Sequence, residues 1–192
     1  LGPAGWRLAE DRLIDTLIGC AIVLLIGFAP WPMAWYSHLP RQFAQTTLDI
    51  GRYLEEVLGS DPGAVSRARL RRPTYRALAD LRAEFQRTMS EPPAISRRAA
   101  AWWPAVVGLE QVMDAITAAG LAVSRSPGNA VPPDEVRRLG DALRAVSEAA
   151  RTGTEVAPVP GLPDDEILRP VSEAIRSLLG VLGPGQRLTL QG

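Results

Sequence analysis

A long uncharged run near the N-terminus constrains this chain more than any other feature. No Asp, Glu, Lys or Arg lies between Asp15 and Arg41. A helix rises about 1.5 Å per residue, so the roughly 20 residues of Leu17–Tyr36 would cover about 30 Å, the hydrocarbon thickness of a bilayer. We therefore predict one transmembrane helix here. A deeply buried helix of a soluble protein and a signal peptide are the alternatives.

The end of the run has the features of a membrane boundary. Pro30 and Pro32 should end or kink the helix, so its straight part is expected to stop near Ala29. Tyr36 and two tryptophans follow, as in the aromatic belts of membrane interfaces. Arginines beyond Tyr36 favour placing the rest of the chain on the cytoplasmic side.

The start of the span contains the candidate residues for a substrate path or for helix packing. Thr16, Gly19 and Gly27 fall on one side of a helix, where small residues allow a second membrane helix to approach closely. Asp15 is either an intramembrane acid in a path or a carboxylate stabilised by the helix dipole and Arg12. Arg12 could in turn contact an anionic substrate or reach the lipid headgroups.

The remainder shows apolar residues at helical spacing and no alternating stretch of useful length outside the short tail 187–190. We expect an all-α fold, in which the span is followed by a cytosolic bundle of about five amphipathic helices. The predicted domains are 1–36 (flank and last transmembrane helix), 37–152 (bundle), 153–163 (Pro-rich linker) and 164–192 (C-terminal helix and tail). The predicted helices are Leu39–Leu58, Asp61 to about Ser90 with an interruption at Pro73, Ile95–Ser124 with a kink at Pro104, Asp134–Arg151, and Asp164–Leu182.

Composition removes several kinds of chemistry. The chain has no Lys, and its 21 basic residues balance 21 acidic ones. A Walker A loop and a Schiff base are therefore excluded, and a general nucleic-acid binder is disfavoured. One histidine, His38, and one cysteine, Cys20, cannot build a His/Cys zinc site. We expect no enzyme activity, no catalytic residues, no metal, no cofactor and no nucleic-acid partner.

A basic cluster follows the first predicted bundle helix. We expect either contact with anionic lipid headgroups or a plain solvated face. The candidate residues for headgroup contact are Arg67, Arg69, Arg71 and Arg72.

The pattern Arg12-x-x-x-Thr16-x-x-Gly19, which opens the apolar span, resembles the fusaric acid resistance (FUSC)-like and aromatic acid exporter-like integral membrane proteins. The stretches Glu91–Pro93 and Arg97–Pro104 are similar to the C-terminal region of bacterial members. The resemblance covers about residues 7–125. It implies the C-terminal part of an exporter in the bacterial inner membrane, which moves small organic, aromatic acid-like anions. The path would come mostly from upstream transmembrane helices of the same protein.

Two other functions stay open from the sequence. The chain could be a single-span, membrane-anchored module whose helical bundle binds a protein partner. It could also be a wholly soluble helical domain that buries Leu17–Phe28. The expected partners are the upstream transmembrane helices and the lipid bilayer, and a homo-oligomer is left open.

Overall fold

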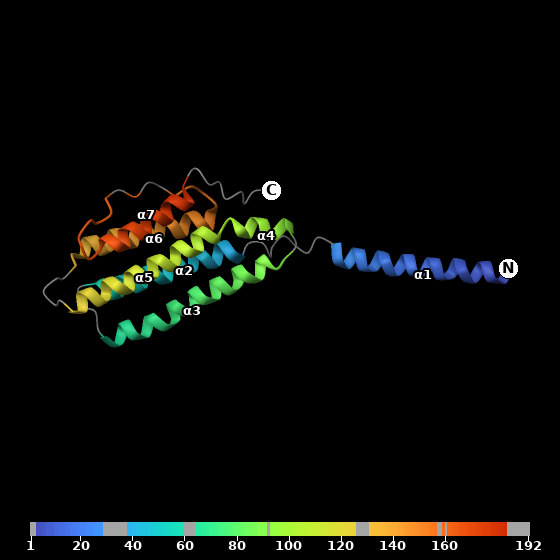
Figure 1. Ribbon diagram of the computed structural model, residues 1–192, viewed down its shortest axis with the longest axis horizontal. Coiled ribbons are helices and arrows are strands. Elements are labelled where there is room, and N and C mark those ends of the chain that lie inside the picture. The colour runs from blue at the N-terminus through green and yellow to red at the C-terminus, as the bar shows by residue number, and fades with distance from the viewer. Residues whose placement is uncertain are drawn as a thin grey trace. The chain divides into compact units, whose positions relative to one another are not determined.

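A computed structural model describes residues 3–28, 38–59, 64–91, 93–125, 131–156, 159 and 161–183. Within these ranges the regular elements are all helices, which confirms the all-α prediction (Figure 1). The helices are α1 (Pro3–Phe28), α2 (His38–Leu58), α3 (Ala64–Met89), α4 (Pro93–Ala100), α5 (Trp103–Arg125), α6 (Pro133–Thr152) and α7 (Arg169–Leu182). The chain divides into two compact units, Leu1–Ser37 and His38–Gly192.

Helix α2 is the central element of the second unit. It packs against α3, α5 and α6, while α7 packs against α5 and α6, and α4 packs against α3. Figure 1 shows these helices lying side by side with α4 at one end. The reason is a strong amphipathic pattern, because α2 buries Phe43, Ile50, Leu54 and Val57 at helical spacing.

Pairs of contacts fix the directions of the helices. Phe43 and Trp102 pack at a tilt with ring centroids 5.3 Å apart near the start of α2 and of α5, and Val57 meets Gly120 near their ends, so these two helices run in the same direction. The Ser147 hydroxyl of α6 donates to the Ala44 carbonyl at 2.8 Å, although Ser147 lies near the end of its helix. Helices α2 and α6 are therefore antiparallel.

Glycines allow close approach at two helix contacts. A Cβ atom on Gly108 of α5 would lie 3.1 Å from Leu178 Cδ1 of α7, and one on Gly120 would lie 2.2 Å from Val57 Cγ1 of α2. Ordinary carbon contacts need about 3.5–4.0 Å. The core between α2, α5 and α7 is thus closed to a larger side chain at these positions.

The predicted helix Ile95–Ser124 is divided by a turn at Ala101–Trp102. The Trp102 amide donates to the Ala99 carbonyl at 2.9 Å, and the Val106 amide donates to the Trp102 carbonyl at 3.0 Å. Pro104 has no amide hydrogen, so the regular ladder cannot pass unbroken through this point. The break thus precedes Pro104 as a turn, where the sequence predicted a kink within one helix.

Two further boundaries differ from the prediction. Helix α3 continues through Pro73, and the Thr74 hydroxyl donates back to the Leu70 carbonyl at 2.8 Å. Helix α7 begins at Arg169, not at Asp164, because Pro170 favours a position in the first turn. The acidic residues 164–166 therefore precede the helix.

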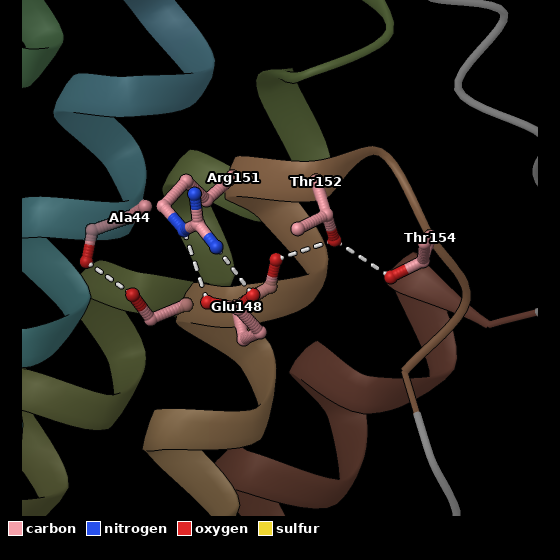
Figure 2. A network of polar contacts seen from close by, with 6 residues as sticks. Ala44, Glu148, Arg151, Thr152 and Thr154 are labelled. Carbon is pink, nitrogen blue, oxygen red and sulfur yellow. Dashed lines mark hydrogen bonds and ion pairs between the residues drawn. The ribbon is translucent and has the colours of Figure 1, made fainter.

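Helix α6 ends in a network of polar contacts that Figure 2 shows from close by. Gly153 has φ 70°, a left-handed conformation that suits glycine, and its amide donates to the Ala149 carbonyl at 2.9 Å. Arg151 makes two hydrogen bonds to the Glu148 carboxylate, at 3.0 and 2.5 Å (Figure 2). The Thr152 hydroxyl donates to the Glu148 carbonyl at 2.7 Å (Figure 2).

Candidate functional site

The apolar side chains of α1 are exposed wherever the structure describes them. Leu13 is 61% exposed and Val23 is 69% exposed, and the other large apolar side chains described in this helix are also exposed. Exposed runs of large apolar side chains in water are unfavourable and mark surfaces that meet another apolar phase. Within its own unit, nothing described covers Leu17–Leu24.

One helical region of the described chain satisfies the length and apolar composition of a membrane span, and this region is not α1. Among the described residues this is Ile95–Arg125, with 44% of its apolar window buried. Val106, Leu109, Val112 and Met113 of this region are 0% exposed. Its apolar composition is therefore explained by the bundle core. In α1, the last 18 helical residues still include three charges, and the uncharged run continues past Phe28 into residues outside the described ranges.

The candidate path residues lie along α1. The Thr16 hydroxyl donates to the Arg12 carbonyl at 2.8 Å. Arg12 and Asp15 are both exposed, and no ion pair joins these two described side chains. A Cβ atom on Gly19 would meet nothing within 4 Å. Gly27 lies in the last turn, and its surroundings are outside the described residues.

Asp15 does not lie at the N-terminus of its helix, where the sequence predicts it. Because the helix begins at Pro3, Asp15 lies in its middle, more than two turns from the N-terminus. The helix dipole acts mainly within the first and last turns, so it gives Asp15 little stabilisation. The prolines and aromatic residues of the predicted membrane boundary, residues 30–36, lie outside the described residues.

The basic cluster occupies the first half of α3. Arg69, Arg71 and Arg72 are exposed, and Arg67 is part of the helix with a side chain outside the description. The Arg71 guanidinium lies over the Tyr75 ring, 5.7 Å from its centroid. The Tyr75 hydroxyl is in turn 3.2 Å from the Thr117 hydroxyl of α5. No acidic side chain pairs with these three arginines within the described part of the chain.

The second half of α3 differs because it is tied to α5. Arg82 bonds Glu110 at 3.1 Å and lies 5.9 Å from the centroid of the Trp103 ring. Phe85 packs on the same tryptophan, with centroids 5.1 Å apart. These contacts hold α3 against α5, and they leave the arginines of the first half free to meet another surface.

Catalytic geometry is not evident in the described residues. They contain no cluster of three or more His, Cys, Asp or Glu side chains that could hold a metal ion. Hydrogen bonding to Arg151 lowers the pKa of Glu148, and hydrogen bonding to Asp141, which outweighs desolvation, raises the pKa of Arg144. Both are ion pairs on the outer face of α6, where such shifts are an ordinary consequence of pairing.

The described chain thus consists of an apolar, exposed helix, α1, followed along the sequence by a helical bundle, α2–α7. No protein-family model matches it, and no solved structure matches it either. Inner membrane protein YccS of Escherichia coli (strain K12) is 34% identical over 93 residues, which is 46% of this chain and 13% of that protein. The chain therefore shares about half of its length with a small part of a much longer inner membrane protein.

Proposed function

We propose that this chain is the C-terminal part of an exporter-like protein of the bacterial inner membrane. Helix α1 crosses the bilayer, and α2–α7 form a domain on the cytoplasmic side. The observation that carries the proposal is the exposed apolar surface of α1, in a chain whose bundle has a hydrophobic core of its own. The similarity to an inner membrane protein supports the same location.

In this proposal α1 contributes one wall of a translocation path. Arg12 would attract an anionic group because its planar guanidinium matches a carboxylate. The open surface at Gly19 would let an upstream transmembrane helix of the same protein pack closely. Asp15, Thr16 and Gly27 would line the path or the same packing surface. The transported compounds would be small organic anions of the aromatic acid type.

Carbonate extraction tests the membrane span. Membranes from cells that produce the chain are washed at alkaline pH, and the chain should stay in the pellet. A peripheral protein would be released into the supernatant, and that result would overturn the span.

Cysteine labelling tests the orientation. Cys20 is the one cysteine in the sequence, so Cys20→Ser removes every thiol, and Gln111→Cys then adds one at an exposed position of α5. A membrane-impermeant maleimide should label Gln111→Cys only after the cells are permeabilised. Labelling of intact spheroplasts would place the bundle on the other side and contradict the proposal.

Transport needs the native protein in proteoliposomes. Uptake or release of an aromatic acid under an ion gradient should fall when Arg12 is changed to Gln, while Arg125→Gln at the end of α5 should leave it unchanged. If the native protein moves no aromatic acid under any gradient, the transport proposal fails. The chain would then be better described as an anchored module that binds a protein partner.

A further inference from the structure

We propose that the outward face of α3 is a docking surface for anionic lipid headgroups. The lipid-contact face consists of Arg69, Arg72 and Arg76, with Arg71 on the adjoining flank. This proposal rests on the proposed function in one respect, the attachment of the bundle to the membrane through α1. The charge and exposure of α3 are properties of the bundle itself.

The charge of the chain is concentrated in this helix. Helix α3 contains seven arginines against Asp80 and Glu84, a formal charge of +5 in a chain whose total is zero. The rest of the chain is therefore net negative by the same amount. A basic face on an otherwise acidic body is attracted to an anionic bilayer in one orientation, because the opposite side is repelled.

The spacing places Arg69, Arg72 and Arg76 on one side of the helix. At about 100° per residue, Arg69, Arg72 and Arg76 fall opposite the buried Leu78 and Leu81. All three arginines are exposed and have no acidic partner among the described residues. Their charge is therefore available to phosphate groups, which guanidinium binds through two parallel hydrogen bonds.

Two exposed apolar side chains lie where α3 faces α5, away from the lipid-contact face. Met89 is 41% exposed and Trp103, which packs on Phe85, is 40% exposed. Met89 and Arg71 are about five helical turns apart and in phase, on the flank that faces α5. Met89 and Trp103 therefore do not belong to the lipid-contact face.

The connection to α1 ties the bundle to the predicted membrane span at the start of α2. Nine residues, 29–37, separate the end of α1 from the start of α2. They can span at most about 30 Å, since an extended chain covers about 3.3–3.6 Å per residue. If α1 crosses the bilayer, the start of α2 is held within that distance of the surface, and a lipid contact elsewhere on the bundle becomes an intramolecular event.

Spin-label accessibility tests the docking. The chain with Cys20→Ser carries a label at Ala83→Cys, on the outward face of α3, or at Ser177→Cys, an exposed position of α7. Each variant is reconstituted into vesicles of phosphatidylcholine alone or with phosphatidylglycerol. The Ala83→Cys label should lose access to a water-soluble relaxation agent only with phosphatidylglycerol and low salt, and the Ser177→Cys label should stay accessible.

A matched pair of charge variants tests the residues. Arg69→Gln, Arg72→Gln and Arg76→Gln together should weaken docking about a hundredfold, because each basic residue contributes roughly fivefold. Arg41→Gln, Arg125→Gln and Arg176→Gln change the net charge equally on other helices and should preserve the protection. If both triple variants lose the protection of the Ala83→Cys label equally, net charge alone explains the docking, and the assigned face is wrong.

The remaining outcomes distinguish lipid from an acidic protein as the partner of this face, and distinguish lipid docking from the membrane span of α1. If the Ala83→Cys label stays accessible on anionic vesicles, lipid docking is wrong. Protection in native membranes but not in pure lipid would assign the face to an acidic protein. Carbonate extraction of the same vesicles reports on α1 independently, so a released chain with a protected label would contradict the span and leave the docking intact.

Discussion

Val57 of α2 and Gly120 of α5 lie so close that a Cβ atom on the glycine would be 2.2 Å from Val57 Cγ1. Val57 is buried, and its branched side chain has little rotamer freedom with which to move aside. The contact therefore fixes the distance between the two helices near their C-terminal ends.

We expect Gly120→Ala to lower the free energy of unfolding by about 1–3 kcal/mol, the usual cost of overpacking a core. Gly180→Ala is the control, because a Cβ atom there meets nothing within 4 Å. That change should stabilise helix α7 by about 0.5–1 kcal/mol. Urea unfolding followed by circular dichroism measures both, and equal midpoints for the two variants would contradict the close contact.

The adjacent tryptophans should differ sharply in their contribution to stability. Trp102 is 2% exposed and packs on Phe43, whereas Trp103 is 40% exposed. Trp102→Ala should cost about 3–5 kcal/mol, since it empties a large core volume. Trp103→Ala should cost far less, and urea unfolding measures both variants. A larger loss for Trp103→Ala would show that the division between α4 and α5 is misplaced.

Two buried serines provide a test of hydrogen bonding. Ser147 donates to the Ala44 carbonyl at 2.8 Å, while the Ser172 hydroxyl is buried without a partner among the described residues. Ser147→Ala should destabilise by about 0.5–1.5 kcal/mol. Ser172→Ala should be neutral or stabilising, because it removes an unsatisfied polar group. Calorimetry measures the stability of both variants. A larger loss for Ser172→Ala than for Ser147→Ala would argue against the contact between α2 and α6.

The ion pair of Glu148 and Arg151 should respond to acid. Hydrogen bonding to Arg151 holds the pKa of Glu148 below its ordinary value of 4.5. A lowered folded pKa means that the carboxylate contributes its full stabilisation above about pH 4.5, and that this is lost as pH falls through the lower folded pKa. Titration by carbon-detected NMR should show the lowered pKa, and Arg151→Gln should raise it back. An unchanged pKa in Arg151→Gln would exclude the pair.

Periodicity predicted most of the bundle correctly. The apolar spacing of Phe43, Ile50, Leu54 and Val57 predicts α2, and all four residues are buried. The division of α4 from α5 was not predicted, because apolar residues stay in phase across it. Pro104 interrupts the ladder there, and Trp102 in the resulting turn packs in the core beside Phe43, a tertiary contact between residues far apart in sequence.

The candidate site was predicted less completely, for a physical reason. The sequence alone located the uncharged run and the cluster Arg67–Arg72. It could not say which arginines would find acidic partners, because pairs such as Arg82 with Glu110 join residues from different helices. The same limit applies to Glu55, which bonds Arg144 at 3.0 Å across the contact of α2 with α6.

The central position of α2 also has a consequence for the order in which the chain is made. Its most extensive partner is α6, and Ala44 and Ser147 are 103 residues apart. Synthesis at about 5–20 residues per second separates Ala44 from Ser147 by roughly 5–20 seconds. During that interval α3 and α5 can already pack on α2, while the side of α2 that α6 covers in the folded bundle still lacks its partner.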